Sequence, residues 1–536
     1  MKRCGIFGWG VVAPKSPNIE AFERNLDHAT SWLTPHTGFG PSNFLVGRPE
    51  FDFSIYKSWL DKRFGPRRFS QLNEKMGNMA KYAMGAFIQA LGQNPGIESV
   101  LQELETKAHI YVGTGLGDFP LQYDKVLIYY KAQKRWNRFW CRKIHHPELA
   151  AYLQASAAEK QRILERVDAP QDPDSLDPEN VDLDDITEDW YAFWVNRSEG
   201  LKQYLTALTK IEGESITGDI NKEKMHVMRR KSNSRRKLNE SYGCPIEPWS
   251  AVDPMLLWNI PNIPAAQISM IGKITGATFA PVAACSGFGT ALKLGLNAIQ
   301  LNQAKAVVIG TTDPQPHPLS VGAFFGARVL SHDGQVSKPF SGLRGTHISG
   351  GACIWIIGDA DYFIQKGFQP LGLEILSVAL TSDADHIITP SQKGPRTAIH
   401  EALHAAGVSP RDVSTWDMHA TATPGDWSEL QNTLEVFPGT TRFTARKGSF
   451  GHGMSVCGGW ELTAQHMGFS KGKLLPIDLR EDELHDRVRP YHRCLVDDES
   501  ETMEGDIAGK INMGVGGINA CVISRRWPSD PEEKDD

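Results

Sequence analysis

The sequence of 536 residues lacks several patterns that would decide its class at once. No window approaches the ~20 consecutive apolar residues of a membrane-spanning helix. Its 8 cysteines are scattered, without CxxC pairs or metal-ligand spacing. The apolar run that starts at Cys4 is short, broken by glycine and ends in proline, unlike a secretory signal. We therefore expect reduced thiols, no stable membrane span and a cytoplasmic location.

Signatures of bound cofactors and of nucleic acid are also missing. No strand-linked GxGxxG with a downstream acid is present, so nicotinamide binding is not predicted. No residue pattern requires a metal or a flavin. The formal charge of -6 argues against a general nucleic-acid binder, although basic clusters occur locally. Hydrophobic residues at 40% and charged residues at 22% describe an ordinary globular protein.

Short apolar runs that lead into glycine turns alternate with helical patterns along most of the chain. The runs are continuous, as in strands covered on both faces, and lie at 109–113, 306–310, 354–358 and 520–523. Helical patterns lie between them, for example over 288–301 and 396–406. This alternation predicts a layered α/β protein, and its recurrence in both halves suits a duplicated core.

Residues 118–258 differ from the rest and predict a mostly helical, charged insert. We expect the acidic run at 172–185 to be a loop, and the basic run at 228–237 a solvated helix or a mobile segment. Aromatic residues alternate with arginines between Trp136 and Arg142. Burial of these rings against the core or a dimer partner is favoured over contact with nucleic acid or a membrane.

Cys285 lies in the segment AACSGFG, at a predicted junction between a strand and a helix. The dipoles and free N–H groups of a helix N-terminus favour a thiolate, and small neighbours admit a thioester substrate. A buried structural cysteine is the ordinary alternative for one such residue.

Two histidines stand in similarly small-residue frames, His419 in HATATP and His452 in KGSFGH. Neutral imidazoles can donate N–H groups to a thioester carbonyl and stabilise the enolate left when a malonyl group loses CO2. Core histidines are the alternative, since the chain has 17. Lys447 precedes His452 by five residues and can add positive charge or pair with a carboxylate. The glycines around Val515 let a main-chain N–H face the oxygen of a thioester.

In their order and framing, these segments resemble those of the β-ketoacyl-ACP synthases, the Cys-His-His condensing enzymes of the thiolase-like fold. Ala284-Cys285-Ser286 is similar to the family's nucleophile turn. Residues 419–424 resemble its HGTxTP segment, 447–452 its KxxxGH segment and 514–519 its GFGGTN segment. The likeness covers most of the chain outside the insert.

The resemblance implies an α/β thiolase-like fold with a duplicated five-layer α-β-α-β-α core plus the mostly helical insert. Residues 1–117 and 259–360 would form the N-terminal half, with the nucleophile in the second piece. Residues 361–526 would form the C-terminal half, and residues 527–536 a disordered acidic tail.

The resemblance also implies a role for each framed residue. Cys285 would take an acyl chain from an acyl carrier protein, and His419 and His452 would promote decarboxylation of the malonyl-carrier and hold its enolate. Lys447 would support His452. The main-chain N–H groups of Cys285 and Val515 would form the oxyanion hole.

Contacts with the carrier protein follow from the same resemblance. Thr421 and Thr423 would contact its phosphopantetheine arm, so no cofactor of the chain's own is expected. The family's basic patch for the acidic carrier protein is matched by Lys62, Arg63, Arg67 and Arg68, for which a solvated basic face is the alternative.

The chain departs from the family pattern at several positions. Val515 stands where the family usually has a phenylalanine gate, so the acyl-pocket gate is expected to differ. The family's GEGAG segment is Ser349-Gly-Gly-Ala-Cys353 here, which removes the acid that usually packs near the lysine. Ala420 replaces a glycine and Ile518 a threonine. These changes suggest a specialised pathway.

We therefore expect a β-ketoacyl synthase for decarboxylative Claisen condensation in fatty-acid or polyketide-type biosynthesis, acting as a homodimer or with a ketosynthase-like partner. One alternative is a non-condensing, chain-length-factor type subunit, although such partners usually lack the cysteine. Another is a thiolase-fold acyltransferase that uses CoA thioesters and a second cysteine, for which Cys457 is the nearest candidate. The starter acyl group, the chain length and the pathway stay open.

Overall fold

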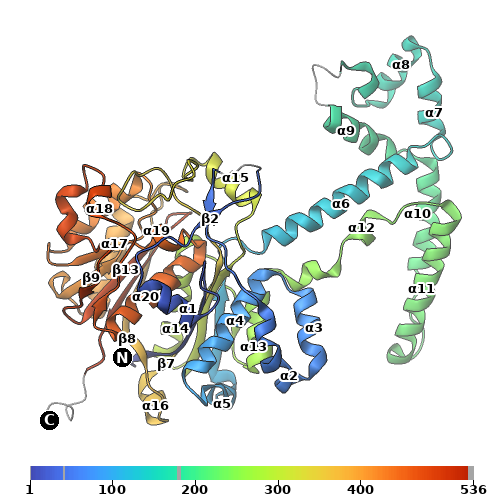
Figure 1. Ribbon diagram of the computed structural model, residues 1–536. Coiled ribbons are helices and arrows are strands. Elements are labelled where there is room, and N and C mark those ends of the chain that lie inside the picture. Colours follow the sequence, from blue (N-terminus) through green and yellow to red (C-terminus); the bar gives the residue numbers. More distant parts are fainter. Residues whose placement is uncertain (1, 40–42, 178–182, 529–536) are drawn as a thin grey trace. The chain divides into compact units, whose positions relative to one another are not determined.

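The computed structural model describes residues 2–39, 43–177 and 183–528 (Figure 1). The chain forms two compact units. The core unit is Met1–Leu121 with Leu257–Asp536, and the insert unit is Gln122–Leu256. Most of the expected acidic tail, from residue 529 onward, lies outside the described residues.

The first half of the core unit contributes five strands to a ten-stranded sheet, in the order β5-β4-β6-β7-β1. They are β1 (Cys4–Val12), β4 (Ala108–Gly113), β5 (Thr278–Phe279), β6 (Ala306–Asp313) and β7 (Gly351–Asp359). Strand β4 is parallel to both β5 and β6, whereas β7 is antiparallel to β6 and β1. Every residue of β1, β4, β6 and β7 is buried, as the continuous apolar runs predict.

The second half repeats this arrangement in the order β10-β9-β13-β14-β8. Its strands are β8 (Leu371–Ser382), β9 (Val413–Asp417), β10 (Arg442–Thr444), β13 (Ile507–Gly514) and β14 (Ile518–Arg525). Strand β9 is parallel to both β10 and β13, and β14 is antiparallel to β13 and β8. The matching order and directions identify a duplicated core. A short antiparallel pairing of β1 with β8 joins the halves.

Helices cover both faces of each half and form the remaining layers (Figure 1). One outer cluster of apolar side chains packs α4 (Asn78–Gln93) and α13 (Ile263–Gly272) on the first half. A central cluster, with α14 (Gly287–Gln300) and α20 (Cys457–Ser470), contacts strands of both halves. A third cluster packs α17 (Lys393–Ala406) on the second half. The expected α-β-α-β-α order is thus confirmed.

Shorter elements complete the core unit. The further helices are α1 (Ile19–Leu26), α2 (Lys57–Phe64), α3 (Pro66–Lys75), α5 (Ile97–Glu103), α15 (Pro318–Gly326), α16 (Ala360–Gln365), α18 (Gly425–Val436) and α19 (Lys447–Phe450). Two small hairpin-like sheets pair β2 (Thr34–Pro35) with β3 (Leu45–Val46) and β11 (Lys473–Leu474) with β12 (Glu501–Thr502).

The insert unit is helical wherever it is described in regular structure. Its helices are α6 (Phe119–Trp140, which starts in the core unit), α7 (Pro147–Gln154), α8 (Ala157–Val167), α9 (Leu183–Val195), α10 (Glu199–Glu212), α11 (Ile220–Tyr242) and α12 (Pro248–Ala251). The basic run at 228–237 lies within α11. Of the acidic run, residues 178–182 fall outside the described residues and α9 begins at Leu183.

The aromatic segment of the insert corrects one expectation. Trp136, Phe139 and Trp140 pack in the insert's own core, in one cluster with Trp194 and Tyr204. Helical spacing explains this packing. Trp136, Phe139 and Trp140 are three and four positions apart, so they share one face of α6, and that face is buried against the other helices of the insert. Within the described ranges, no helix is long and apolar enough to cross a bilayer.

We expect Trp140→Ala to destabilise the insert unit by about 3–5 kcal/mol, because it empties a fully buried ring site. Amide hydrogen exchange resolved to the insert helices measures the change. Trp249→Ala is the matched control, since that ring contacts Trp136 of the same cluster but is 51% exposed, and its loss should cost under about 1 kcal/mol. Equal losses in the two variants would contradict this packing.

Candidate active site

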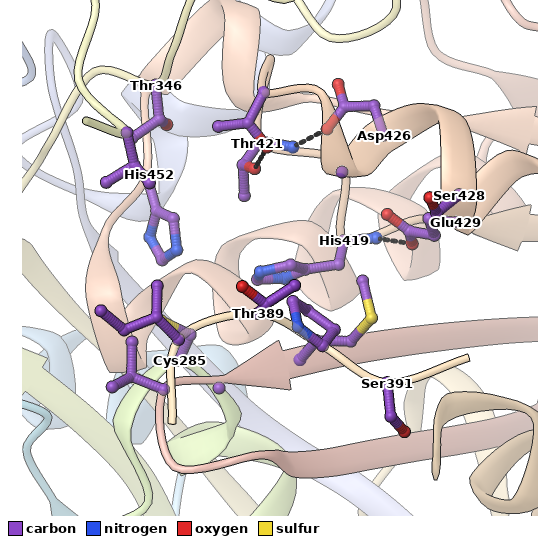
Figure 2. Close-up of a pocket in the computed structure, with 18 of the residues that line it drawn as sticks. Cys285, Thr346, Thr389, Ser391, His419, Thr421, Asp426, Ser428, Glu429 and His452 are labelled. Atoms are coloured by element: carbon purple, nitrogen blue, oxygen red, sulfur yellow. Dashed lines mark hydrogen bonds between the residues drawn. The ribbon is translucent and has the colours of Figure 1, made fainter. Parts of the chain in front are cut away.

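Both halves of the core unit line one cavity of about 340 Å³. The first half supplies Cys285 and the second half supplies His419 and His452. Figure 2 shows these three side chains pointing toward one another across the cavity. The sequence therefore identified three side chains that the fold gathers from distant segments.

Cys285 lies in a 3-10 turn, Ala284–Ser286, immediately before α14. Ala284 adopts a left-handed backbone with φ of 46°, which turns the chain sharply into the helix. The single proton of the Ser286 hydroxyl is shared between the carbonyls of Asn512 (3.1 Å) and Ile518 (2.7 Å). The nucleophile turn of the first half is thereby fixed to the β13–β14 hairpin of the second half.

The thiol itself differs from the expectation of a thiolate. Burial raises the pKa of Cys285 to about 11, and the nearby N–H groups and the Lys447 charge oppose this rise without cancelling it. The main-chain N–H groups of Val515 and Cys285 both face the sulfur. Two main-chain donors thus converge at the sulfur, and donors so placed can stabilise negative charge that develops beside it.

His419 follows β9 in a turn held by two carboxylates of α18. Glu429 accepts the N–H groups of His419 (2.6 Å) and Ala420 (2.8 Å), and Asp426 accepts those of Thr421 (2.7 Å) and Ala422 (2.9 Å). Burial raises the pKa of Asp426 to about 6 and that of Glu429 to about 7. Figure 2 shows both acids beside the turn.

His452 is fixed by its own main chain and by the turn that follows. Its N–H donates to the His347 carbonyl (2.6 Å), and its Nδ1 accepts the N–H of Met454 (3.0 Å). The proton of the neutral ring is therefore on Nε2. Burial, with help from the Lys447 charge, lowers the pKa of His452 to about 3. The same two causes lower the pKa of His419 well below its ordinary value, so both rings are neutral at pH 7.

Lys447 pairs with a carboxylate, as expected, and its charge helps to lower the pKa of His452, but its direct hydrogen bond is to the His419 turn. Its Nζ donates to the His419 carbonyl and pairs with Glu461 on α20 at 2.6 Å. The acid missing from the 349–353 segment is therefore supplied by another element, and the support goes to His419 through its main chain. Burial favours neutral Glu461, but the charges of Lys447 and Lys510 together hold its pKa below the ordinary value.

Ser349 has a different function in the segment where the family has its acid. Its hydroxyl donates to the Phe450 carbonyl and braces the turn before His452. Gly451 in that turn has φ of 74°, and an added Cβ there would meet the Ser349 Oγ at 2.2 Å. Gly451 therefore leaves the space that the Ser349 hydroxyl occupies in this turn.

The two threonines and Val515 line the cavity, while the roles expected for them stay predictions. The hydroxyls of Thr421 and Thr423 are 3.0 Å apart and line it. Val515 also lines it and is 45% exposed. Residues 388–392 form a further wall that sequence reasoning missed, and Ile387 accepts the Gly516 N–H at 2.7 Å.

The proposed basic patch does not reach the cavity lining. Lys62 and Arg63 lie on α2, and Arg67 and Arg68 on α3. Arg63 pairs with Glu98 at 2.6 Å and stacks on Trp59 at 3.7 Å from the ring centre. That guanidinium is thus already engaged in an ion pair, although the residue is exposed.

Several charged residues of the site gave no signal in the sequence. They are buried and act through main-chain groups or other charges: Asp417, Asp426, Glu429, Arg446, Glu461 and Lys510. Among the described residues, no group of three or more histidine, cysteine, aspartate or glutamate side chains is arranged to hold a metal ion.

Two family models match the chain. The one described as Beta-ketoacyl synthase, N-terminal domain, matches residues 227–358, and the one described as Beta-ketoacyl synthase, C-terminal domain, matches residues 373–477. The first match contains Cys285 and begins within α11 of the insert. The second contains His419, Lys447 and His452.

The curated relatives are named 3-oxoacyl-[acyl-carrier-protein] synthases, which is another name for β-ketoacyl synthases. The chain is 26% identical over 287 residues to 3-oxoacyl-[acyl-carrier-protein] synthase 2 of Staphylococcus aureus (strain COL), covering 51% of this chain and 67% of that protein. It is 28% identical over 276 residues to the chloroplastic 3-oxoacyl-[acyl-carrier-protein] synthase I of Arabidopsis thaliana, covering 49% and 57%.

Solved structures share the fold at lower identity. The ishigamide ketosynthase/chain length factor matches with a TM-score of 0.66 at 16% identity, covering 98% of this chain and all of that chain. A β-ketoacyl synthase from Burkholderia phymatum STM815 matches with a TM-score of 0.66 at 15% identity and the same coverage. These likenesses identify the thiolase-like fold.

The raised pKa of Cys285 predicts how its alkylation depends on pH. Because the thiolate is the nucleophile, the iodoacetamide rate should rise about tenfold per pH unit from pH 7 to 10. Mass spectrometry of the Cys285 peptide measures the rate. A free peptide cysteine, with a pKa of about 8.5, should level off above pH 9. A plateau of the Cys285 rate below pH 8 would contradict the assigned burial effect.

Proposed function

Since the chain belongs to the β-ketoacyl synthase family of acyltransferases, we propose that Cys285 carries the acyl chain during decarboxylative condensation with a malonyl thioester. One observation supports this most strongly. A thiol, two neutral imidazoles and two converging main-chain N–H groups line the same cavity. Each of them fits a separate step of this reaction.

In the first step the Cys285 sulfur attacks the carbonyl carbon of an incoming acyl thioester. The oxygen takes the negative charge beside the N–H groups of Cys285 and Val515. The carbon–sulfur bond to the pantetheine arm breaks, and the thiol proton ends on the departing sulfur. Cys285 is left as an acyl thioester, and because the protein thiol is protonated at pH 7, no charge is created overall.

In the second step a malonyl thioester binds with its carbonyl oxygen toward the two imidazoles. The bond to the carboxylate breaks, CO2 leaves, and the electron pair forms an enolate whose oxygen accepts N–H groups from His419 and His452. Neutral rings suit this step, since they donate a proton in a hydrogen bond without transferring it. The low pKa of His452 fits that requirement.

In the third step the enolate carbon attacks the acyl thioester on Cys285. The tetrahedral oxygen again lies beside the two main-chain donors, and the bond to Cys285 sulfur breaks. The products are a β-ketoacyl thioester and, after uptake of one proton from solvent, the free thiol. Lys447 holds the His419 turn through its main-chain carbonyl throughout the cycle.

An acyl carrier protein is the proposed donor of both thioesters. Its phosphopantetheine arm would pass the hydroxyls of Thr421 and Thr423, and its acidic surface would meet Lys62, Arg63, Arg67 and Arg68. The chain would then need no cofactor of its own. A cytoplasmic location and a homodimer or a heterodimer with a ketosynthase-like partner remain predictions.

Two alternatives have specific observations against them. A non-condensing partner subunit does not need the thiol, yet this chain keeps it with both imidazoles at one cavity. A CoA-dependent thiolase needs a second cysteine as base. The Cys457 thiol does not line the cavity and donates to the Met454 carbonyl (3.0 Å), and burial raises its pKa strongly.

We expect Cys285→Ala to lose condensation by about a thousandfold or more, because the acyl-enzyme cannot form. Product formation from an acyl thioester and malonyl-carrier protein, with mass spectrometry of the intact protein, measures both effects. Cys494→Ala is the control, since this buried cysteine does not line the cavity. Full activity of Cys285→Ala would overturn the proposal.

The purified chain, assayed alone, should release CO2 from malonyl-carrier protein. A subunit that serves only as a scaffold lacks this activity. Release by wild type together with loss in a His419→Ala variant would identify the imidazole as the group responsible. No release under conditions where Cys285 becomes acylated would favour the partner-subunit alternative.

A further inference from the structure

Asn512 lies on β13 directly behind His419 and does not line the cavity. Its side chain is 3% exposed. The amide nitrogen is 3.4 Å from Nδ1 of His419 and 3.4 Å from a carboxylate oxygen of Glu461. Asn512 therefore bridges a proposed catalytic ring and the buried charge cluster formed by Lys447, Glu461 and Lys510.

The charge cluster fixes which end of the amide faces these groups. Glu461 lies between the ammonium groups of Lys447 (2.6 Å) and Lys510 (2.7 Å), and all three side chains are buried. A carboxylate held ionised in this way can only accept hydrogen bonds. The amide nitrogen of Asn512 must therefore point toward Glu461, because the amide oxygen would be repelled.

That orientation decides the position of the proton on His419. An amide nitrogen carries two hydrogens and no acceptor site. Its two nearer partners are Glu461 and Nδ1 of His419, each at 3.4 Å, while the Cys457 sulfur is a more distant contact at 4.0 Å. One hydrogen therefore faces Glu461 and the other faces Nδ1 of His419. Nδ1 must then be unprotonated. The proton of the neutral imidazole lies on Nε2, the ring nitrogen left for the cavity.

We infer that Asn512 is a positioning residue that sets the tautomer of His419, so that its Nε2–H is available to a substrate oxygen. The inference rests on the proposed function, in which that N–H holds the enolate. Asn512 would act only through His419 and would touch neither the acyl chain nor the malonyl group.

The two imidazoles reach the same protonation by different means. Nδ1 of His452 accepts a main-chain N–H from Met454, which no substitution at that position except proline removes. His419 depends on one side chain. Its tautomer is thus the one that can be changed by mutation while the ring and its carboxylate-bound turn stay in place.

Loss of the amide donor leaves Nδ1 of His419 without its hydrogen bond. The neutral ring can then carry its proton on either nitrogen, and the tautomer with Nδ1–H presents a lone pair to the developing oxyanion. Removal of one donor to an oxyanion typically lowers kcat about 100- to 1000-fold. Acylation of Cys285 uses main-chain donors and should be far less affected.

Two nearly isosteric variants test the inference, Asn512→Leu and Asn512→Asp. The first removes the donor, and the second places an acceptor beside Nδ1 and draws the proton to it. The probes are S-malonyl-pantetheine for CO2 release and S-hexanoyl-N-acetylcysteamine for acylation of Cys285. We expect CO2 release at pH 7 to fall about 100-fold in both variants, with KM and the acylation rate within a few-fold of wild type.

The pH profile separates a tautomer effect from simple loss of packing. In the Asn512→Asp variant, protonation of His419 at lower pH restores an Nε2–H. The rate of CO2 release relative to wild type should therefore recover as the pH falls. Asn512→Leu should show no such recovery. Charged and titratable groups around His419 belong to several elements, namely Cys285, Asp417, Glu429, Lys447, His452, Cys457, Glu461 and Lys510. The profile is therefore compared between variants, which share all of these groups.

Gln465→Leu is the matched control. This amide on α20 is also buried and also contacts β13, donating to the Gly509 carbonyl at 2.9 Å. Because its donor is directed to that carbonyl and not to His419, CO2 release should stay within a few-fold of wild type. An equal loss in the control would mean that disturbance of β13 explains the effect and would overturn the inference.

The outcomes distinguish the inference from the proposed function. If wild type acylates Cys285 and releases CO2 while both Asn512 variants match it, the role of Asn512 is wrong and the proposed function stands. If wild type does neither with these probes or with carrier-bound substrates, the proposed function fails. A deficit in Asn512→Asp that stays constant between pH 5.5 and 8 would refute the tautomer assignment.

Discussion

The buried pairing of Glu461 with Lys447 and Lys510 is the interaction on which the rest of the site depends. Each charge removed from water costs several kcal/mol unless it is paired and hydrogen-bonded, so these side chains have little freedom to move apart. Lys447 belongs to α19, Glu461 to α20 and Lys510 to β13. One carboxylate therefore fixes the relative positions of three elements around His419.

Buried charges, within this cluster and beside it on α18, explain why the turns of the second half can be short and rich in glycine. Small residues leave room for substrate but supply few packing contacts of their own. Rigidity comes instead from carboxylates that accept main-chain N–H groups, Glu429 and Asp426 on α18, and from the Lys447 contact with the His419 carbonyl. Preorganised donors can then face the cavity without rearranging during the reaction.

The fold and the reactive residues could be predicted from the sequence because their signals are local. Continuous apolar runs marked strands such as β6, and small-residue frames marked Cys285, His419 and His452. The buried partners could not be predicted in this way. Glu461 lies on a helix, nine residues beyond His452, and nothing in its neighbours indicates that it replaces an acid missing near Ser349.

The protonation of Cys285 was predicted wrongly for a related reason. A helix N-terminus can be recognised in a sequence, but the degree to which a thiol is removed from water cannot, and here desolvation outweighs the favourable dipoles. The aromatic segment of the insert shows the same limit of local sequence patterns. Its spacing indicated burial, whereas the surface that buries it, the insert's own core, depends on long-range packing.

The hydrogen bonds of Ser286 couple the position of the nucleophile to the strand pairing of the second half. The nucleophile belongs to the first half, yet the hydroxyl next to it is held by carbonyls on β13 and β14 of the second. A slip in the pairing of those two strands would move the sulfur as well as the histidines. The contacts of Ser286 with β13 and β14 thus fix the two halves relative to each other. Neither half can shift without moving the sulfur away from the two histidines.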